Sequence, residues 1–134
     1  MEPQRLKIFV VDDDVTILTV CKDILKSTYD TYPLPSAKAM FSLLETTTPD
    51  LILLDVKMSQ MNGYEAARML KERDDTKDIP IMFLTGLNDT QHEMKGLELG
   101  AVDFIRKPVA AAILFQRIKT HLAVAAKRKT TNSG

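Results

Sequence analysis

Acidic, hydroxyl and basic side chains occur at the same relative place in this chain, each directly after an apolar run. Asp12 and Asp13 follow KIFVV, Asp55 closes DLILLD, Thr85 closes IPIMFLT, and Lys107 follows DFIR. If these runs are parallel strands of one sheet, their carboxyl ends share one edge and the polar groups meet there. Such a cluster predicts a site that binds a divalent cation and handles a phosphoryl group.

The acidic residues of this predicted site repel one another unless a cation lies between them. Carboxylate oxygens with open coordination positions suit Mg²⁺. Asp55, at the end of a wholly apolar run, is the candidate nucleophile toward phosphorus, and its attack would form an aspartyl phosphate. Mg²⁺, the Lys107 ammonium and the Thr85 hydroxyl would each meet part of the charge on the transferred group.

Five apolar runs alternate with segments of helical periodicity, which is typical of a parallel sheet with crossover helices. The second run contains Pro33 and precedes Pro35, so this strand is expected at a sheet edge. Right-handed crossovers then predict a flavodoxin-like, doubly wound α/β fold with strand order 2-1-3-4-5 and helices on both faces. The predicted strands are 6–11, 32–34, 51–54, 79–84 and 102–105, and the predicted helices are about 15–28, 37–46, 64–73, 90–99 and 109–126.

Several residues are placed to complete the backbone hydrogen bonds at the helix ends. Asp14 and Ser36 are predicted N-caps, and Thr90 with Glu93 has the spacing of a capping box. Gly100 is expected to stop the fourth helix.

The composition is that of one ordinary globular domain, with 134 residues of which 45% are hydrophobic and 27% charged. Basic and acidic residues both number 18, so overall charge predicts neither nucleic acid nor a membrane as a partner. The single Cys21 excludes an internal disulfide, and its helical spacing favours a buried hydrophobe. No apolar run approaches the ~20 residues of a membrane span, and no signal peptide is recognisable, so a cytoplasmic protein is expected.

Four motifs, in order, carry a resemblance to a known family: VVDDD, LLDVKMSQMNGYE, FLTGLND and GAVDFIRKP. On these motifs the chain resembles the receiver domain of bacterial two-component response regulators, from Lys7 to about Leu122. We therefore expect a receiver domain over residues 1–126 and a polar, flexible tail at 127–134. The resemblance implies a signalling domain that catalyses only its own phosphorylation and dephosphorylation.

The resemblance also assigns the acidic residues. Asp55 would accept a phosphoryl group from the phosphohistidine of a sensor histidine kinase or phosphotransfer protein. Asp12 and Asp13 would organise Mg²⁺ together with Asp55 and the backbone carbonyl of Lys57.

The remaining motif residues are implied to sense the phosphoryl group. Thr85 and Lys107 would contact it, Thr85 and Phe104 would act as the switch pair, and the Lys107–Pro108 bond would be cis. Phosphorylation would then alter the face formed by the fourth helix, the fifth strand and the last helix. That face would meet an output domain, a target protein or a second copy of the chain.

Three positions depart from the usual pattern of the family. Ser59 stands where proline is common, which predicts a looser loop. Lys57 stands two residues after Asp55, where its side chain would lean over the site. Gly86 replaces a common alanine and predicts a more open entrance. Each bears on the lifetime of the phosphorylated state.

Two other functions compete with this interpretation. Asp12-x-Asp14-x-Thr16 resembles the first motif of haloacid-dehalogenase-type phosphatases, in which Asp12 would be the nucleophile and Asp14 the acid. That family needs a further acidic pair after Lys107 and room for a cap, and this chain offers neither. An unphosphorylated binding module is disfavoured because no expected acidic, hydroxyl or ammonium group is missing.

Other polar and aromatic residues also have simpler explanations. His92 and His121 are expected to be solvated surface residues on helices, away from the acidic site. Phe104 in a strand could be plain core. The cations Lys127, Arg128 and Lys129 suit a solvated helix end and not a nucleic-acid patch.

Overall fold

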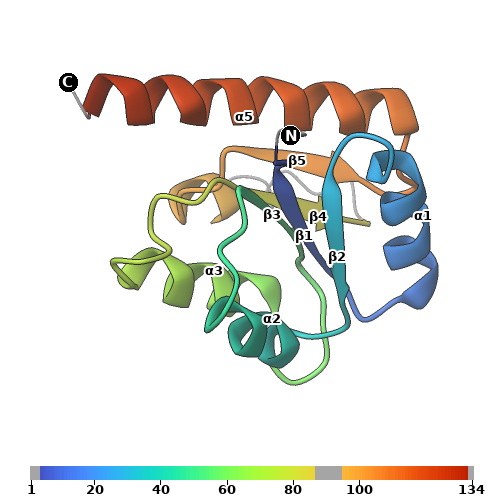
Figure 1. Cartoon of the computed structure of the whole chain (residues 1–134). Helices are drawn as coiled ribbons and strands as arrows, with labels where there is room; N and C mark the ends of the chain where they lie inside the picture. The colour runs from blue at the N-terminus through green and yellow to red at the C-terminus, as the bar shows by residue number, and fades with distance from the viewer. Residues whose placement is uncertain (1–3, 87–94, 133–134) are drawn as a thin grey trace.

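The computed structural model describes residues 4–86 and 95–132, and side chains as far as residue 128. Five strands alternate with helices along the chain (Figure 1). The strands are β1 (Lys7–Val11), β2 (Asp30–Leu34), β3 (Leu51–Asp55), β4 (Ile81–Thr85) and β5 (Asp103–Arg106). The helices are α1 (Val15–Leu25), α2 (Ala37–Leu44), α3 (Gly63–Glu72) and α5 (Ala111–Asn132), and residues 95–98 are also helical.

All five strands are parallel, in the order β2-β1-β3-β4-β5, as the sequence predicts. Every residue of β3 and β4 is buried, because helices cover both faces of the central strands. β2 lies at an edge, where Pro33 needs no ladder partner for a missing N–H. The register places Asp55 beside Leu84 and Thr85 beside Arg106. The carboxyl ends of β3, β4 and β5 therefore lie within about one residue of one another.

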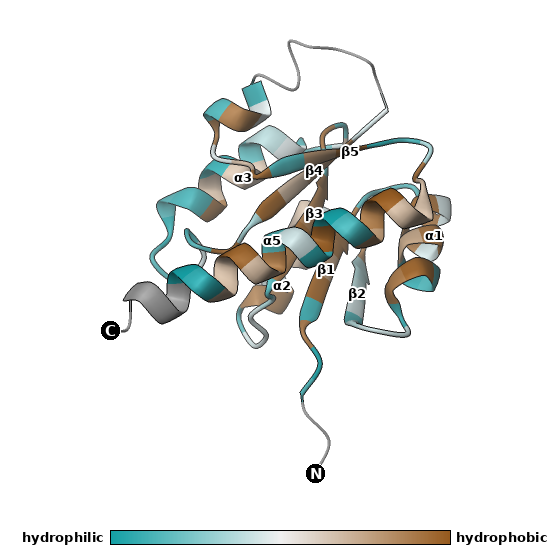
Figure 2. Ribbon diagram, turned by 90° about the horizontal axis from the view of Figure 1, so that it is seen from above, coloured by the Kyte–Doolittle hydropathy of each residue, from teal (hydrophilic) through white to brown (hydrophobic). Residues whose placement is uncertain are grey.

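The sheet separates two hydrophobic cores, since successive strand residues point to opposite faces. Phe9 and Ile52 face α2 and α3, whereas Ile8 and Leu51 face α1 and α5 (Figure 1). In Figure 2 the strands β1 and β4 are coloured mainly as hydrophobic, whereas the edge strand β2 is pale to teal. Cys21 is fully buried in the second core, and burial, with the nearby charge of Asp12, raises its pKa to about 11. The thiol therefore packs as a small hydrophobe, as predicted.

The predicted caps that lie within the described residues are confirmed. The Asp14 carboxylate accepts from the Thr16 amide at 2.9 Å, and the Ser36 hydroxyl accepts from the Ala39 amide at 3.0 Å. Gly100 has a φ of +90° and ends the helical stretch 95–98. The predicted capping box of Thr90 and Glu93 lies outside the described residues.

Three predicted helix ends were wrong. α5 continues to Asn132, so most of the predicted flexible tail is helical. The residues around its predicted end are mainly Ala, Lys and Arg, which are strong helix formers, and no Gly or Pro interrupts them. α1 ends at Leu25, where the Thr28 and Tyr29 amides both donate to the Leu25 carbonyl and close the turn. α2 ends at Leu44, ahead of a β-branched run of threonines.

No helix within the described residues is long and apolar enough to cross a membrane.

Candidate metal and phosphoacceptor site

The polar residues predicted from the strand ends meet in one cavity at the carboxyl edge of the sheet. Asp12 directly follows β1, Asp55 ends β3 and Thr85 ends β4, and all three are buried. Lys107 follows β5, and its amide donates to the Thr85 carbonyl at 2.8 Å. The cavity has a volume of about 300 Å³ and is lined by Asp12, Asp13, Asp14, Asp55, Val56, Lys57, Thr85, Gly86 and Lys107.

The Lys107 ammonium joins the two buried carboxylates. Its Nζ lies 2.8 Å from Asp12 Oδ2 and 3.1 Å from Asp55 Oδ1. The Lys107–Pro108 bond is cis, as the resemblance implies. The Lys107 ammonium thus forms an ion pair with both buried carboxylates. A buried carboxylate needs such a partner to remain ionised.

Three carboxylates form a cluster that fits a hard divalent cation. Oxygen atoms of Asp12, Asp13 and Asp55 all lie within 4.8 Å of one another. The Asp12 Oδ2 contact with Lys107 is an ion pair without hydrogen-bond geometry, and no donor among the described residues hydrogen-bonds this buried oxygen. Three negative charges against one ammonium leave the cluster negative, and its all-oxygen donor set suits Mg²⁺.

The geometry shifts the pKa values of the two central groups. Burial raises the pKa of Asp55 and the charge of Asp12 raises it further, to about 6, while Lys107 opposes the shift. Burial alone would lower the pKa of Lys107, but its contacts with Asp12 and Asp55 outweigh burial and raise it. At neutral pH, therefore, Lys107 is an ammonium ion and Asp55 is largely a carboxylate, which is the form that a nucleophile and a metal ligand require.

The raised pKa of Asp55 makes the metal-free fold less stable as the pH rises. Between the unfolded pKa of 3.8 and the folded pKa of about 6, the folded state binds more protons, so the free energy of unfolding falls with increasing pH. Asp55→Asn is expected to raise that free energy by ~1–3 kcal/mol at about pH 7.5 in EDTA. Urea titrations at about pH 5 and about pH 7.5 test this. A stabilisation that does not grow with pH would contradict the pKa shift.

Magnesium binding should depend on Asp13. Its Oδ2 accepts from the Ser59 amide at 3.3 Å, which holds the exposed carboxylate in the cluster. Asp13→Asn is expected to lower the affinity for Mg²⁺ at least ~10-fold. Removing a residue that hydrogen-bonds to a metal ligand already costs about this factor, and removing a ligand itself costs at least as much. Asp14→Asn is the matched control, since Asp14 caps α1 and asparagine caps equally well. Calorimetry showing equal Mg²⁺ affinity for the two variants would remove Asp13 from the site.

The loop from β3 to α3 returns against the end of β3 at Gly63. Its amide donates to the Val56 carbonyl at 2.9 Å, and a Cβ at this position would lie 2.1 Å from the Asp55 carbonyl oxygen. Gln60 takes a φ of +71° to make the turn. Gly63 lies in the motif LLDVKMSQMNGYE, and the dipeptide Asn62–Gly63 indicates a turn there, but no local pattern indicates its contact with the Asp55 backbone.

Ser59, Lys57 and Gly86, the three residues that depart from the family pattern, lie at or near the acidic cavity. Ser59 is tied into the loop through both backbone groups, since its carbonyl accepts from Met61 and its amide donates to Asp13. Lys57 is exposed and lines the acidic cavity. Gly86 lines the acidic cavity, and a Cβ at this position would meet nothing within 4 Å among the described residues.

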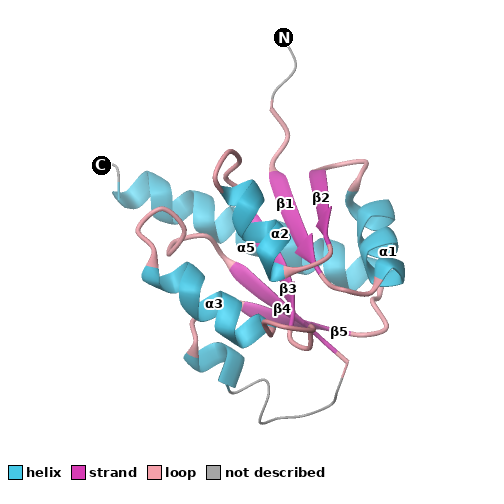
Figure 3. Cartoon of the chain, turned by 90° about the horizontal axis from the view of Figure 1, so that it is seen from below, coloured by secondary structure: helices cyan, strands magenta, loops and turns pink. Residues whose placement is uncertain are grey.

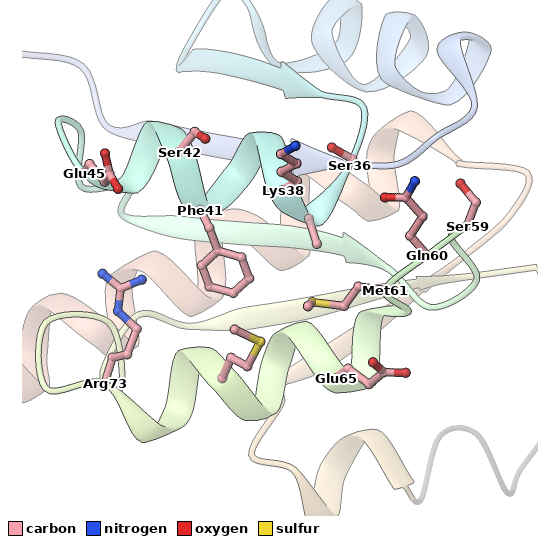
Figure 4. Close-up of a pocket in the computed structure, with 12 residues that line it drawn as sticks. Ser36, Lys38, Phe41, Ser42, Glu45, Ser59, Gln60, Met61, Glu65 and Arg73 are labelled. Atoms are coloured by element: carbon pink, nitrogen blue, oxygen red, sulfur yellow. The ribbon is translucent and has the colours of Figure 1, made fainter.

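A larger cavity of about 650 Å³ lies between α2 and α3. Phe41 points into it from α2 and Met61 from the loop before α3, and charged residues such as Lys38 and Glu65 lie around its rim (Figure 4). It contains none of the predicted site residues and no cluster of acidic, His or Cys ligands among the described residues. Cavity volume therefore does not identify the functional site. We assign the candidate metal site to the smaller acidic cavity, which contains the three clustered carboxylates.

Charged residues on β5 and α5 pair across the two elements, which the sequence pattern did not indicate. His121 Nε2 lies 2.9 Å from Asp103 Oδ2, so His121 is partly buried and paired, and the prediction of a solvated residue was wrong. Arg117 donates to the Phe104 carbonyl at 2.6 Å and lies 3.6 Å from the Asp103 carboxylate. His92 lies outside the described residues. His121 does not line the acidic cavity, in agreement with the expectation from the sequence.

Comparison with known proteins gives the same family. The family model of the response regulator receiver domain matches residues 8–119. A Vibrio cholerae protein described as a probable cyclic di-GMP phosphodiesterase is 37% identical over 115 residues, which make up 86% of this chain and 26% of that protein. The probable transcriptional regulatory protein SilR of Salmonella typhimurium is 35% identical over 118 residues, covering 87% of this chain and 51% of SilR. The chain therefore spans about half, or less, of these curated relatives.

Solved structures agree with the fold. A CheY-like response regulator receiver domain protein from Methanospirillum hungatei has a TM-score of 0.85 at 27% identity, covering 93% of this chain and 99% of that one. The signal receiver domain of a signal transduction histidine kinase from Syntrophus aciditrophicus has a TM-score of 0.79 at 36% identity, covering 87% and 89%. With the parallel sheet and the acidic cavity at its carboxyl edge, these matches show that the chain belongs to the response regulator receiver domains of two-component systems.

Proposed function

We propose that Asp55 is the phosphoacceptor of this receiver domain and takes its phosphoryl group from the phosphohistidine of a sensor histidine kinase or phosphotransfer protein. The observation that carries the proposal is a buried carboxylate at the base of an acidic cavity, with an ammonium 3.1 Å away. Asp12, Asp13 and Asp55, with the backbone carbonyl of Lys57, would hold Mg²⁺. When bound, the ion supplies positive charge to the phosphoryl oxygens.

The transfer exchanges one bond for another at phosphorus. An Asp55 carboxylate oxygen bonds to phosphorus while the bond from phosphorus to the donor imidazole nitrogen breaks. Lys107 then leaves its direct pairing with Asp55 to meet a phosphoryl oxygen, and the Thr85 hydroxyl donates to another. Later attack by water on phosphorus restores the Asp55 carboxylate and releases inorganic phosphate. The domain thus catalyses only its own phosphorylation and dephosphorylation.

The phosphatase alternative is not supported. The receiver-domain model matches residues 8–119, and Asp14, the acid that the alternative requires, caps α1. The phosphodiesterase name of one relative belongs to a protein of which this chain matches only 26%.

The output of the switch is proposed to be the face made by residues 95–98, β5 and α5. Phe104 lies on β5, three residues before Lys107, and its ring stacks on Phe83 with centroids 6.4 Å apart. Drawing Thr85 and Lys107 toward a phosphoryl group opens space near β4, into which Phe104 turns. The changed face would meet an output domain, a target protein or a second copy of the chain. We place the domain in the cytoplasm, without direct contact to membrane or nucleic acid, on the family resemblance and the balanced charge.

Beryllofluoride with Mg²⁺, which imitates the phosphoryl group, tests this output. We expect amide chemical-shift changes at the acidic cavity and also at Gly96, Phe104 and the first turns of α5, because the two packings differ there. Asp55→Asn serves as the control and should show none of these changes. Changes confined to the residues that line the acidic cavity would contradict the proposed output face.

A further inference from the structure

Three aromatic rings form a row from the phosphoacceptor loop to the edge of the sheet. Tyr64, in the first turn of α3, packs edge-to-face on Phe83 of β4, with centroids 5.2 Å apart and planes at 69°. Phe83 stacks on Phe104 at 6.4 Å and 25°, and the two residues are register partners in the sheet. Since Tyr64 directly follows Gly63, which lies against the Asp55 backbone, the row begins at the phosphoacceptor and ends at the switch aromatic.

The helical stretch 95–98 rests on this row through two contacts, and it lies beside α3 in Figure 3. The first contact depends on Gly96, where a Cβ would come within 2.8 Å of the Phe104 ring and 2.9 Å of the Phe83 ring. The second is a cation–π contact, in which Lys95 Nζ lies 4.8 Å from the centroid of the Tyr64 ring. The stretch is thus seated on all three rings.

Lys95 also borders open space next to the acidic cavity. It lines a cavity of about 490 Å³ together with Val56, Lys57, Met58, Asn62 and Tyr64. Val56 and Lys57 line the acidic cavity as well, so the two cavities share a wall. The Lys95 side chain therefore has room to leave the Tyr64 ring when the stretch moves.

We propose that Lys95 is a positioning residue of the switch, which holds the stretch 95–98 on α3 in the unphosphorylated state. The proposal rests on the function proposed above. When Phe104 turns toward Thr85, its ring moves away from Gly96. The stretch 95–98 then loses one of the two rings against which Gly96 packs. A stretch that then moves cannot keep the Lys95 contact. The contact therefore stabilises the resting packing alone and opposes activation, because only a differential contact shifts such an equilibrium.

Removal of the cation should bring the unphosphorylated domain closer to its active packing. In Lys95→Met without any phosphoryl mimic, the Gly96 and Phe104 amide resonances are expected to move toward their beryllofluoride positions. The half-saturating beryllofluoride concentration is expected to fall about two- to five-fold, the factor that corresponds to an exposed cation–π contact. Lys95→Arg keeps a cation over the ring and should behave as the unchanged protein.

Two further variants separate this role from a loss of charge. Lys22→Met removes an exposed lysine of α1, and Lys38→Met removes an exposed lysine of α2 that lines neither of the two adjoining cavities. Neither should move the Phe104 resonance in the absence of the mimic. If Lys95→Met matches either of these variants, or if Lys95→Arg does not restore the resting spectrum, the proposal is overturned. Failure of the proposed function is a different result, in which the unchanged protein itself shows no Asp55-dependent response to beryllofluoride.

Discussion

The Asp55→Asn variant is expected to incorporate no detectable phosphoryl group from acetyl phosphate or from a phosphohistidine donor. An amide oxygen is a poor nucleophile, and the amide also removes one of the three charges that attract Mg²⁺. The substitution is nearly isosteric, and Lys107 keeps its 2.8 Å contact with Asp12, so the fold should persist. Phosphoryl incorporation is measured by intact-protein mass spectrometry, which records the added mass directly.

The Asp14→Asn variant is the control for this experiment. It makes the same chemical change next to the acidic cluster, at a residue that caps α1, and should retain phosphorylation. Circular dichroism of both variants checks that the fold is intact. Phosphorylation of Asp55→Asn at the rate of Asp14→Asn would contradict the assignment of the phosphoacceptor.

Alanine at Gly63 is expected to destabilise the fold by about 2–4 kcal/mol, because the added methyl overlaps backbone and not a movable side chain. Its Cβ would lie 2.1 Å from the Asp55 carbonyl oxygen, 2.9 Å from the Asp55 carbonyl carbon and 3.0 Å from Val56 Cα. Either α3 must move away or the end of β3 must shift. Since Asp55 ends β3, a shift of the strand also displaces the Asp55 carboxylate from the acidic cluster, so Mg²⁺ affinity should fall with stability.

The matched control is Gly86→Ala. At this second glycine of the site, a Cβ meets nothing within 4 Å among the described residues. Its free energy of unfolding should remain within ~0.5 kcal/mol of the unchanged protein. Urea unfolding with and without Mg²⁺ measures both variants. Equal stability of Gly63→Ala and Gly86→Ala would show that the close approach at Gly63 is not maintained in solution.

The sheet and the acidic cavity could be predicted because both follow from local signals. Pro33 marks an edge strand, and the wholly apolar run before Asp55 marks a central one. In a parallel sheet the residues that end the strands share an edge, so the types of Asp12, Asp55, Thr85 and Lys107 were enough to predict the cavity.

What the sequence did not reveal depends on contacts between distant residues. The pairing of His121 with Asp103 requires the rotation of α5 about its axis, which periodicity defines only approximately. The length of α5 was underestimated because a polar, basic segment with helix-forming residues has the same composition as a mobile tail. The need for glycine at position 63 comes from the backbone of Asp55, to which no local pattern refers.

We propose that one buried carboxylate, Asp55, and not its buried neighbour Asp12, accepts the phosphoryl group. Lys107 pairs with both acids, so proximity to the ammonium alone does not separate them. The assignment to Asp55 rests on the motif LLDVKMSQMNGYE, which carries the family resemblance and in which Asp55 is the residue that closes the buried strand β3.

The most direct test is to map the phosphorylated residue in the unchanged protein. The domain is treated with acetyl phosphate and Mg²⁺, the acyl phosphate is reduced with borohydride, and the peptides are sequenced by mass spectrometry. Reduction converts a phosphorylated aspartate to homoserine and leaves a free aspartate unchanged. We predict homoserine at position 55 and aspartate at positions 12, 13 and 14. Homoserine at position 12, with Asp55 unmodified, would contradict the account.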